Sequence, residues 1–88
     1  MPTGIIEEPL YKEQIDALRI DWKRLDEAFQ EVEHAILVVP DIFHPIPGTK
    51  LRRVKLVGFP GVPPLSIFFA VQGETAHLVA AELITGED

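Results

Sequence analysis

The chain has 88 residues, no cysteine and a formal net charge of −6 at pH 7. The absence of cysteine excludes disulfide bonds and thiolate metal sites, and the acidic balance disfavours non-specific nucleic-acid binding, which requires clustered lysine and arginine. A hydrophobic share of 47% is ordinary for a folded domain and too high for a disordered chain. We therefore expect a single domain over residues 1–88 that is stabilised by packing.

The sequence does not suggest a membrane protein. Residues 1–8 lack the basic start of a signal peptide, and Glu7 and Glu8 interrupt their apolar run. The longest uncharged run, residues 56–73, contains three prolines and cannot cross a bilayer as a regular helix. Since the lack of cysteine also fits a reducing compartment, these features predict a cytoplasmic protein without a membrane partner.

The first half of the chain has the pattern of a strand followed by helical structure. Residues 4–8 predict a short edge strand, which Pro9 ends. The apolar residues that follow alternate in spacing between 3 and 4, which places them on one stripe of a helix with a charged opposite face; they are Ile15, Leu18, Trp22, Leu25, Phe29, Val32 and Ile36. The stripe fits one long helix or two helices that meet near residues 19–21, with Asp21 as the N-cap of the second. The helical part should end before Pro40, because a residue that precedes proline avoids the α conformation.

The second half predicts an antiparallel meander. Residues 40–49 contain three prolines and a glycine, and we expect an ordered loop there that is neither helix nor strand. Alternating patterns rich in β-branched and aromatic residues then predict three strands, at residues 51–57, 64–71 and 76–84. A hairpin turn at residues 72–75 joins the last two strands, and the third is apolar enough to suggest burial on both faces. Residues 85–88 should fray.

The predicted fold is therefore α+β. It consists of a short N-terminal strand, two helices or one long broken helix, and a three-stranded antiparallel meander with the helices on one face. The helical stripe would cover that face. A weaker alternative treats the stripe as a coiled-coil or bundle surface of a homodimer, since it spans about three heptads.

Few residues have the spacing of a catalytic or metal site. His34, His44 and His77 fall on a helix, a loop and a strand without metal-ligand spacing, and we expect them to be ordinary polar residues. Ser66 is the only serine and has no nucleophile motif around it. Helical residues two apart do not face each other, so Glu31–Glu33 fits a solvated surface better than a catalytic dyad. We expect no metal ion and no cofactor.

One stretch is locally positive. Residues 50–55 contain four basic side chains and no acid. Residues two apart on a strand point the same way, so Arg53 and Lys55 should share one face, with Arg52 on the other. Two adjacent cations fit phosphates or a carboxylate-rich partner. A solubilised sheet face, or pairing with the chain's own excess of acids, accounts for the same pattern equally well.

Four segments carry a resemblance to a known family, namely residues 40–43, 47–56, 63–71 and 73–81. They contain a proline that closes the helical part, a Pro/Gly loop that enters a basic strand, a strand with aromatic residues, and a tight hairpin into an apolar strand. With these features in this order, the chain resembles the RelE/ParE superfamily of bacterial toxin–antitoxin systems over nearly its whole length.

The resemblance implies a small twisted sheet with two helices on one face. RelE-like members cleave mRNA on the ribosome with basic and aromatic side chains of the open face, ParE-like members poison DNA gyrase, and an antitoxin that wraps the toxin inactivates both. Arg53 and Lys55 look like the family's basic strand, and Arg52 adjoins them. The resemblance therefore makes Arg52, Arg53 and Lys55 candidate catalytic residues that hold phosphates. Many nuclease members carry Tyr or His with basic residues near the C-terminus, whereas all charged residues within residues 82–88 of this chain are acidic.

The resemblance therefore predicts a toxin-like component of a bacterial type II toxin–antitoxin system. It implies a cognate antitoxin as partner, RNA on the ribosome or DNA gyrase as target, and endoribonuclease activity if the resemblance extends to the chemistry. The acidic residues at positions 82–88 favour an alternative. In this alternative the same fold is a non-catalytic module that binds another protein or a second copy of itself.

Overall fold

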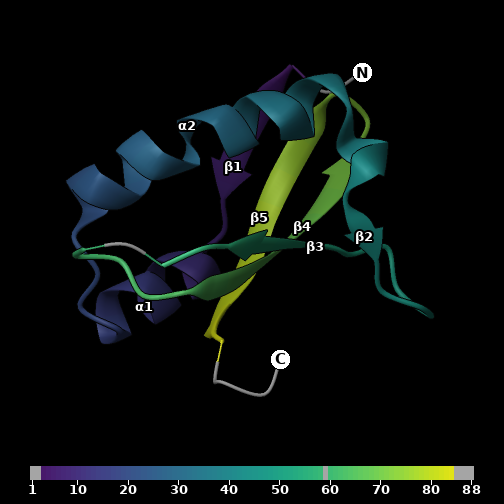
Figure 1. The fold of residues 1–88 in the computed structure, drawn as a ribbon. Coiled ribbons are helices and arrows are strands. Elements are labelled where there is room, and N and C mark those ends of the chain that lie inside the picture. Colours follow the sequence, from purple (N-terminus) through teal and green to yellow (C-terminus); the bar gives the residue numbers. More distant parts are fainter. Residues whose placement is uncertain (1–2, 59, 85–88) are drawn as a thin grey trace.

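The computed structural model describes residues 3–58 and 60–84, and within these residues helices pack on a five-stranded sheet (Figure 1). The elements in chain order are β1 (Gly4–Glu7), α1 (Pro9–Ala17), α2 (Trp22–Val38), the 3-10 helix η1 (Pro40–Ile42), β2 (His44–Pro45), β3 (Arg52–Leu56), β4 (Leu65–Gln72) and β5 (Thr75–Leu83). The strand order is β1-β5-β4-β3-β2. Because β1 runs parallel to β5 while the other neighbours are antiparallel, the sheet is mixed, and the predicted α+β class is confirmed.

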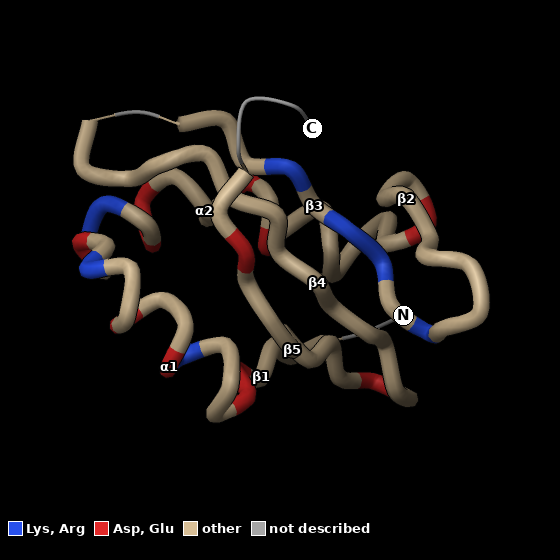
Figure 2. Tube along the Cα trace, turned by 90° about the horizontal axis from the view of Figure 1, so that it is seen from below, with Lys and Arg blue, Asp and Glu red and all other residues tan. Residues whose placement is uncertain are grey.

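Both helices pack on the same face of the sheet. Side chains of the predicted stripe form one buried cluster with the inward-facing residues of β3, β4 and β5; the stripe members in its centre are Ile15, Leu25, Phe29 and Ile36. The other members, Leu18, Trp22 and Val32, are partly buried against it. Tyr11, which is 1% exposed, extends the stripe by one turn beyond the predicted residues. The opposite side of the sheet, which we call the open face, carries no helix among the described residues (Figure 2).

The stripe is divided between two helices because α1 ends in a Schellman motif. Arg19 follows the last turn in the left-handed conformation, with a φ of 56°. Its N–H donates to the carbonyl of Asp16, and the N–H of Ile20 donates to the carbonyl of Ile15 at 3.4 Å. The chain reversal directs Ile20 into the core, where it is 5% exposed, although this residue lies off the helical stripe.

The helix α2 begins and ends where the sequence predicts. Asp21 is its N-cap, and the Asp21 carboxylate accepts hydrogen bonds from the N–H groups of Lys23 and Arg24 at 3.0 and 3.4 Å. These bonds satisfy donors that the first helical turn leaves without a partner. The helix ends at Val38, ahead of Pro40, as expected from the restriction that proline places on the preceding residue.

Glycine at position 19 should stabilise the domain. A left-handed conformation is costly for residues with a Cβ atom, and glycine is the residue that this position of the motif prefers. We expect Arg19→Gly to raise the free energy of unfolding by about 0.5–1 kcal/mol, measured by urea denaturation. The control Glu27→Gly, on the exposed side of α2, should lower it by about 1 kcal/mol. Destabilisation by Arg19→Gly would contradict the proposed strain at Arg19.

The prediction that residues 40–49 contain neither helix nor strand is wrong in part, because η1 and β2 lie there. The guanidinium of Arg52 donates to the carbonyl of Phe43 at 2.8 Å and pairs with the Asp41 carboxylate at 3.4 Å. These contacts hold the segment against β3, where β2 forms the outermost strand. Pro45 is tolerated in β2 because a strand at a sheet edge has one side without ladder hydrogen bonds.

The meander of β3, β4 and β5 agrees with its prediction to within one residue at each boundary, and β1 is an edge strand as expected. Gly73 has a φ of 61° in the tight turn between Gln72 and Thr75. The burial of β5 differs from its prediction, because the buried residues Ala76, Leu78 and Ala81 alternate with partly exposed ones. Only one side of β5 faces the helices. The expectation for residues 85–88 lies outside the described residues.

Candidate functional site

The basic strand β3 presents two different surfaces. Val54 and Leu56 are buried in the core, and Arg52 lies on their side of the strand. Arg53 and Lys55 lie on the open face, as the alternation along the sequence predicts. Figure 2 shows the Lys and Arg positions gathered along β3 and the segment that enters it.

A pocket of about 300 Å³ on the open face is lined by His44, Arg53 and Lys55. Its geometry follows from strand pairing. His44 of β2 lies directly opposite Arg53 of β3, and directly paired residues place their Cβ atoms about 4.5–5.5 Å apart on the same face. Lys55 stands two residues further along β3, on the same side. The pocket therefore combines an imidazole, a guanidinium and an ammonium group.

Arg53 is held in place by the neighbouring strand. Its Nε donates to the hydroxyl oxygen of Ser66 at 2.8 Å. Ser66 lies opposite Lys55 in the β3–β4 ladder and is only 2% exposed. Ser66, which has no nucleophile motif around it, therefore has a structural role, because its hydroxyl orients the Arg53 side chain in the pocket.

The structure separates Arg52 from the other two candidates. Its guanidinium lies on the helix side of the sheet, where it bonds to the Phe43 carbonyl and the Asp41 carboxylate. Phe43 in turn packs edge-to-face against the core residue Phe69, with ring centroids 5.5 Å apart. Arg52 therefore fixes the segment that carries His44, and it does not contribute a cation to the pocket.

Sequence reasoning treated His44 as an ordinary loop residue. His44 reaches the pocket because β2 pairs with β3. The three prolines in residues 40–49 favour a loop over a strand, so the sequence does not predict this pairing. The other histidines lie elsewhere: His34 is exposed on α2, and His77 Nδ1 lies 2.6 Å from Glu8 Oε1. Across residues 3–58 and 60–84, no three His, Asp or Glu side chains gather closely enough to hold a metal ion.

The pocket has the side chains needed to bind and act on a phosphodiester. A guanidinium and an ammonium group bind phosphate oxygens by charge-assisted hydrogen bonds. An imidazole exchanges protons near neutral pH. Phe68 lies opposite Arg53 in the β3–β4 ladder, on the same face and partly exposed, where an aromatic ring can stack with a base.

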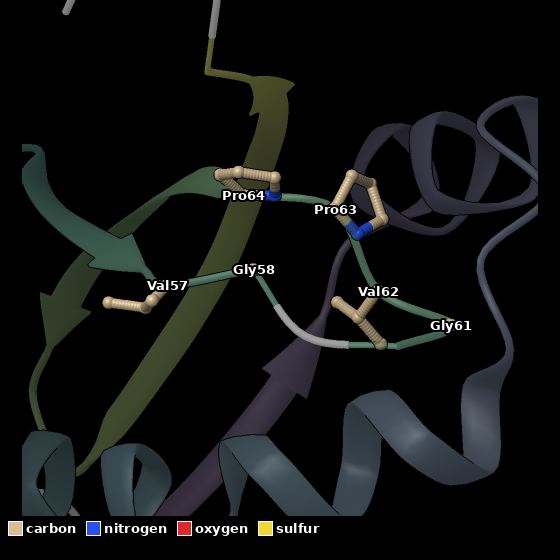
Figure 3. A pocket seen from close by; sticks show the side chains of 6 residues that line it. All are labelled: Val57, Gly58, Gly61, Val62, Pro63 and Pro64. Atoms are coloured by element: carbon tan, nitrogen blue, oxygen red, sulfur yellow. The ribbon is translucent and has the colours of Figure 1, made fainter. Parts of the chain in front are cut away.

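A second, larger hollow lies at the other end of β3 (Figure 3). It is a shallow, open depression with a volume of about 620 Å³, and its described lining residues are Val57, Gly58, Gly61, Val62, Pro63 and Pro64. None of them carries a titratable or nucleophilic group. The close approach of Gly58 to the Pro64 ring explains a glycine there, because a Cβ atom would lie 2.7 Å from Pro64 Cδ. We assign this hollow to the packing of the connection between β3 and β4.

No protein-family model matches the chain, and no curated protein matches it significantly. In the part of the chain that the structure describes, no helix is long and apolar enough to cross a membrane.

Proposed function

We propose that the chain is a toxin-like component of a bacterial type II toxin–antitoxin system and that its open face acts on RNA. The observation that carries the proposal is the pocket of His44, Arg53 and Lys55, which lies opposite the helices. The order of a short strand, two helices and an antiparallel meander, with both helices on one face, agrees with what the family resemblance implies.

In the proposed reaction, Arg53 and Lys55 bind the oxygens of one phosphodiester and stabilise the negative charge that develops on them. The ribose 2′-hydroxyl attacks the phosphorus and the bond to the 5′-oxygen breaks. The products are a 2′,3′-cyclic phosphate and a 5′-hydroxyl. The 2′-hydroxyl loses one proton and the 5′-oxygen gains one. His44 is the described lining residue that carries an imidazole, and we assign it this proton transfer.

The test is expression from an inducible promoter in a bacterial host, followed by assays of the purified protein on single-stranded RNA. We expect growth arrest and RNA cleavage from the parent protein. His44→Ala should slow cleavage by about 10²-fold or more, because general acid–base groups contribute that much. Arg53→Ala with Lys55→Ala should weaken RNA binding and reduce the slope of log K against log salt by about 1.4.

The matched control is the double variant Lys12→Ala and Lys23→Ala, which removes the same charge from exposed positions on α1 and α2. It should behave like the parent protein. Harmless expression together with no RNA cleavage would contradict the proposal. Growth arrest without RNA cleavage, but with loss of gyrase supercoiling, would move the target from RNA to DNA gyrase.

A second candidate function is a non-catalytic module that binds another protein through the same fold. The net charge of −6 favours it, since an acidic protein is poorly suited to the ribosome surface. This candidate predicts a homodimer or a stable complex with a partner such as an antitoxin, and no RNA cleavage. Light scattering of the purified chain and pull-down from its native host distinguish the two functions, and a monomer without partners would contradict the second.

A further inference from the structure

One acidic side chain shares the open face with the basic pocket. The strands β3, β4 and β5 lie side by side in the sheet (Figure 1). Lys55 of β3 lies directly opposite Ser66 of β4, and Ser66 lies directly opposite Glu82 of β5. Directly paired residues point to the same side of a sheet, so the exposed Glu82 side chain lies on the open face. Neither the binding nor the cleavage of the phosphodiester proposed above uses this carboxylate.

An aromatic ring lies between the pocket and Glu82. Phe68 of β4 is partly exposed and lies opposite Arg53 of β3 on one side and opposite Ala80 of β5 on the other. Glu82 follows Ala80 by two residues on the same face, which makes it a diagonal neighbour of Phe68 at a separation of about 7–8 Å. Since the side chain of Ala80 is a single methyl group, it is too small to cover the ring of Phe68 from β5.

This row of side chains has the dimensions of one nucleotide. Adjacent strands are about 4.8 Å apart, so β3 and β5 are separated by roughly 9–10 Å. A phosphate bound by Arg53 and Lys55 lies over β3, and a base that stacks on Phe68 lies over β4. The sugar joins the two, and the outer edge of the base is then directed towards β5, where Glu82 lies.

A carboxylate distinguishes the four bases by their hydrogen-bond donors, because it accepts hydrogen bonds and donates none. Guanine presents two neighbouring donors, N1–H and the N2 amino group, which match the two oxygens of a carboxylate. Adenine and cytosine each present one amino group beside a ring nitrogen that is an acceptor. Uracil presents one N–H between two carbonyl oxygens. In these three bases an acceptor would face the carboxylate, which is unfavourable.

We propose that Glu82 selects guanine in the nucleotide whose phosphate occupies the pocket. The Glu82 carboxylate accepts hydrogen bonds from N1–H and the N2 amino group, while the base stacks on Phe68. This inference rests on the proposed function for the phosphate, and it adds the preference for one base. The substrate class is single-stranded RNA with an unpaired guanine next to the cleaved bond, since base pairing would occupy the same edge of the base.

The first test measures binding alone, so that its result does not depend on cleavage. The probes are the monophosphates of guanosine, inosine and adenosine, with the phosphate on the 3′ or the 5′ carbon, titrated into the full chain by calorimetry at pH 7. Inosine differs from guanosine only by the missing N2 amino group. We expect guanosine monophosphate to bind about tenfold more tightly than inosine monophosphate, because one hydrogen bond to a charged group is lost. Adenosine monophosphate should bind more weakly still.

The variant Glu82→Gln tests the hydrogen-bond pattern separately from the charge. Its amide combines one acceptor with one donor, which match the N6 amino group and N1 of adenine. We expect this variant to lose the preference for guanosine over inosine monophosphate and to bind adenosine monophosphate about tenfold more tightly than the parent protein does. A carboxylate that only repels phosphate would instead give an equal gain for all three nucleotides.

The matched control is Glu74→Gln, which removes the same charge from an exposed position in the turn between β4 and β5. It should keep the order of affinities of the parent protein. Equal affinities of the parent for the three nucleotides, the absence of nucleotide binding, or an equal gain for all three in Glu82→Gln would each overturn the role of Glu82.

A second test separates this inference from the proposed function. The substrate is an RNA in which all four bases occur unpaired, and the broken bonds are mapped along it. We expect cleavage next to guanine in the parent protein and a shift towards adenine in Glu82→Gln. Cleavage without preference for a base would support the proposed function and overturn the role of Glu82. The expected order of nucleotide affinities without any cleavage would support the role of Glu82 and contradict the proposed cleavage.

Discussion

Replacing Phe69 by alanine should lower the free energy of unfolding by about 3–5 kcal/mol, the range expected for a large aromatic residue removed from a core. Phe69 is fully buried and packs edge-to-face against Phe43, with the ring planes at 90°. An 88-residue domain has a total stability on the order of 4–13 kcal/mol, so the loss would be a large share of the total. Urea denaturation followed by circular dichroism measures it.

Phe68 provides the matched control for this experiment. It is the preceding residue of the same strand, but it lies on the open face and is only partly buried. Phe68→Ala should therefore cost no more than about 1–2 kcal/mol. If both substitutions destabilised the protein equally, the assignment of the two sheet faces would be wrong. The Phe68 variant also tests the proposed function, since it should weaken RNA binding without unfolding the domain.

Replacing Gln14 by methionine should lower the free energy of unfolding by about 1–3 kcal/mol, the cost of leaving a buried donor without a partner. β1 pairs with β5 only as far as Leu78. Beyond that point α1 lies beside β5, and the side-chain oxygen of Gln14 accepts a hydrogen bond from the N–H of Ala81 at 2.7 Å. Methionine keeps a similar shape but removes the strong acceptor.

Hydrogen exchange gives a local readout for the same variant, because the amide of Ala81 should exchange faster in Gln14→Met than in the parent protein. Gln14→Glu retains a side-chain oxygen and should keep most of the stability and protection. Glu13→Met, at the neighbouring exposed position of α1, should leave both unchanged. An unaltered exchange rate at Ala81 in Gln14→Met would contradict the role given to this hydrogen bond.

Much of the fold could be predicted because the relevant patterns are local in the chain. The spacing of residues such as Leu25 and Phe29 marks the buried side of a helix, and the alternation of Arg53, Val54 and Lys55 assigns each side chain to a sheet face. The α+β class and the strand positions followed from these patterns. The prediction failed at β2, because its two residues form a strand only when β3 lies beside them.

The candidate site could be predicted only in part. The shared face of Arg53 and Lys55 follows from the period of a strand. The addition of His44 depends on the register between β2 and β3, and the support from Ser66 depends on the register between β3 and β4. The separate task of Arg52 was not predicted either, because its partners Phe43 and Asp41 are brought to it by the path of the preceding loop.

The sequence by itself determined the fold class, the division into a helical half and a strand half, and which side chains share a face with their near neighbours. Those properties depend on the repeat of the helix and of the strand, which adjacent residues specify. The tertiary structure alone decided which distant groups meet: His44 with Arg53, Gln14 with Ala81, and Glu8 with His77. Strand order, register and the position of sheet edges arise from packing between distant segments, which no local pattern encodes.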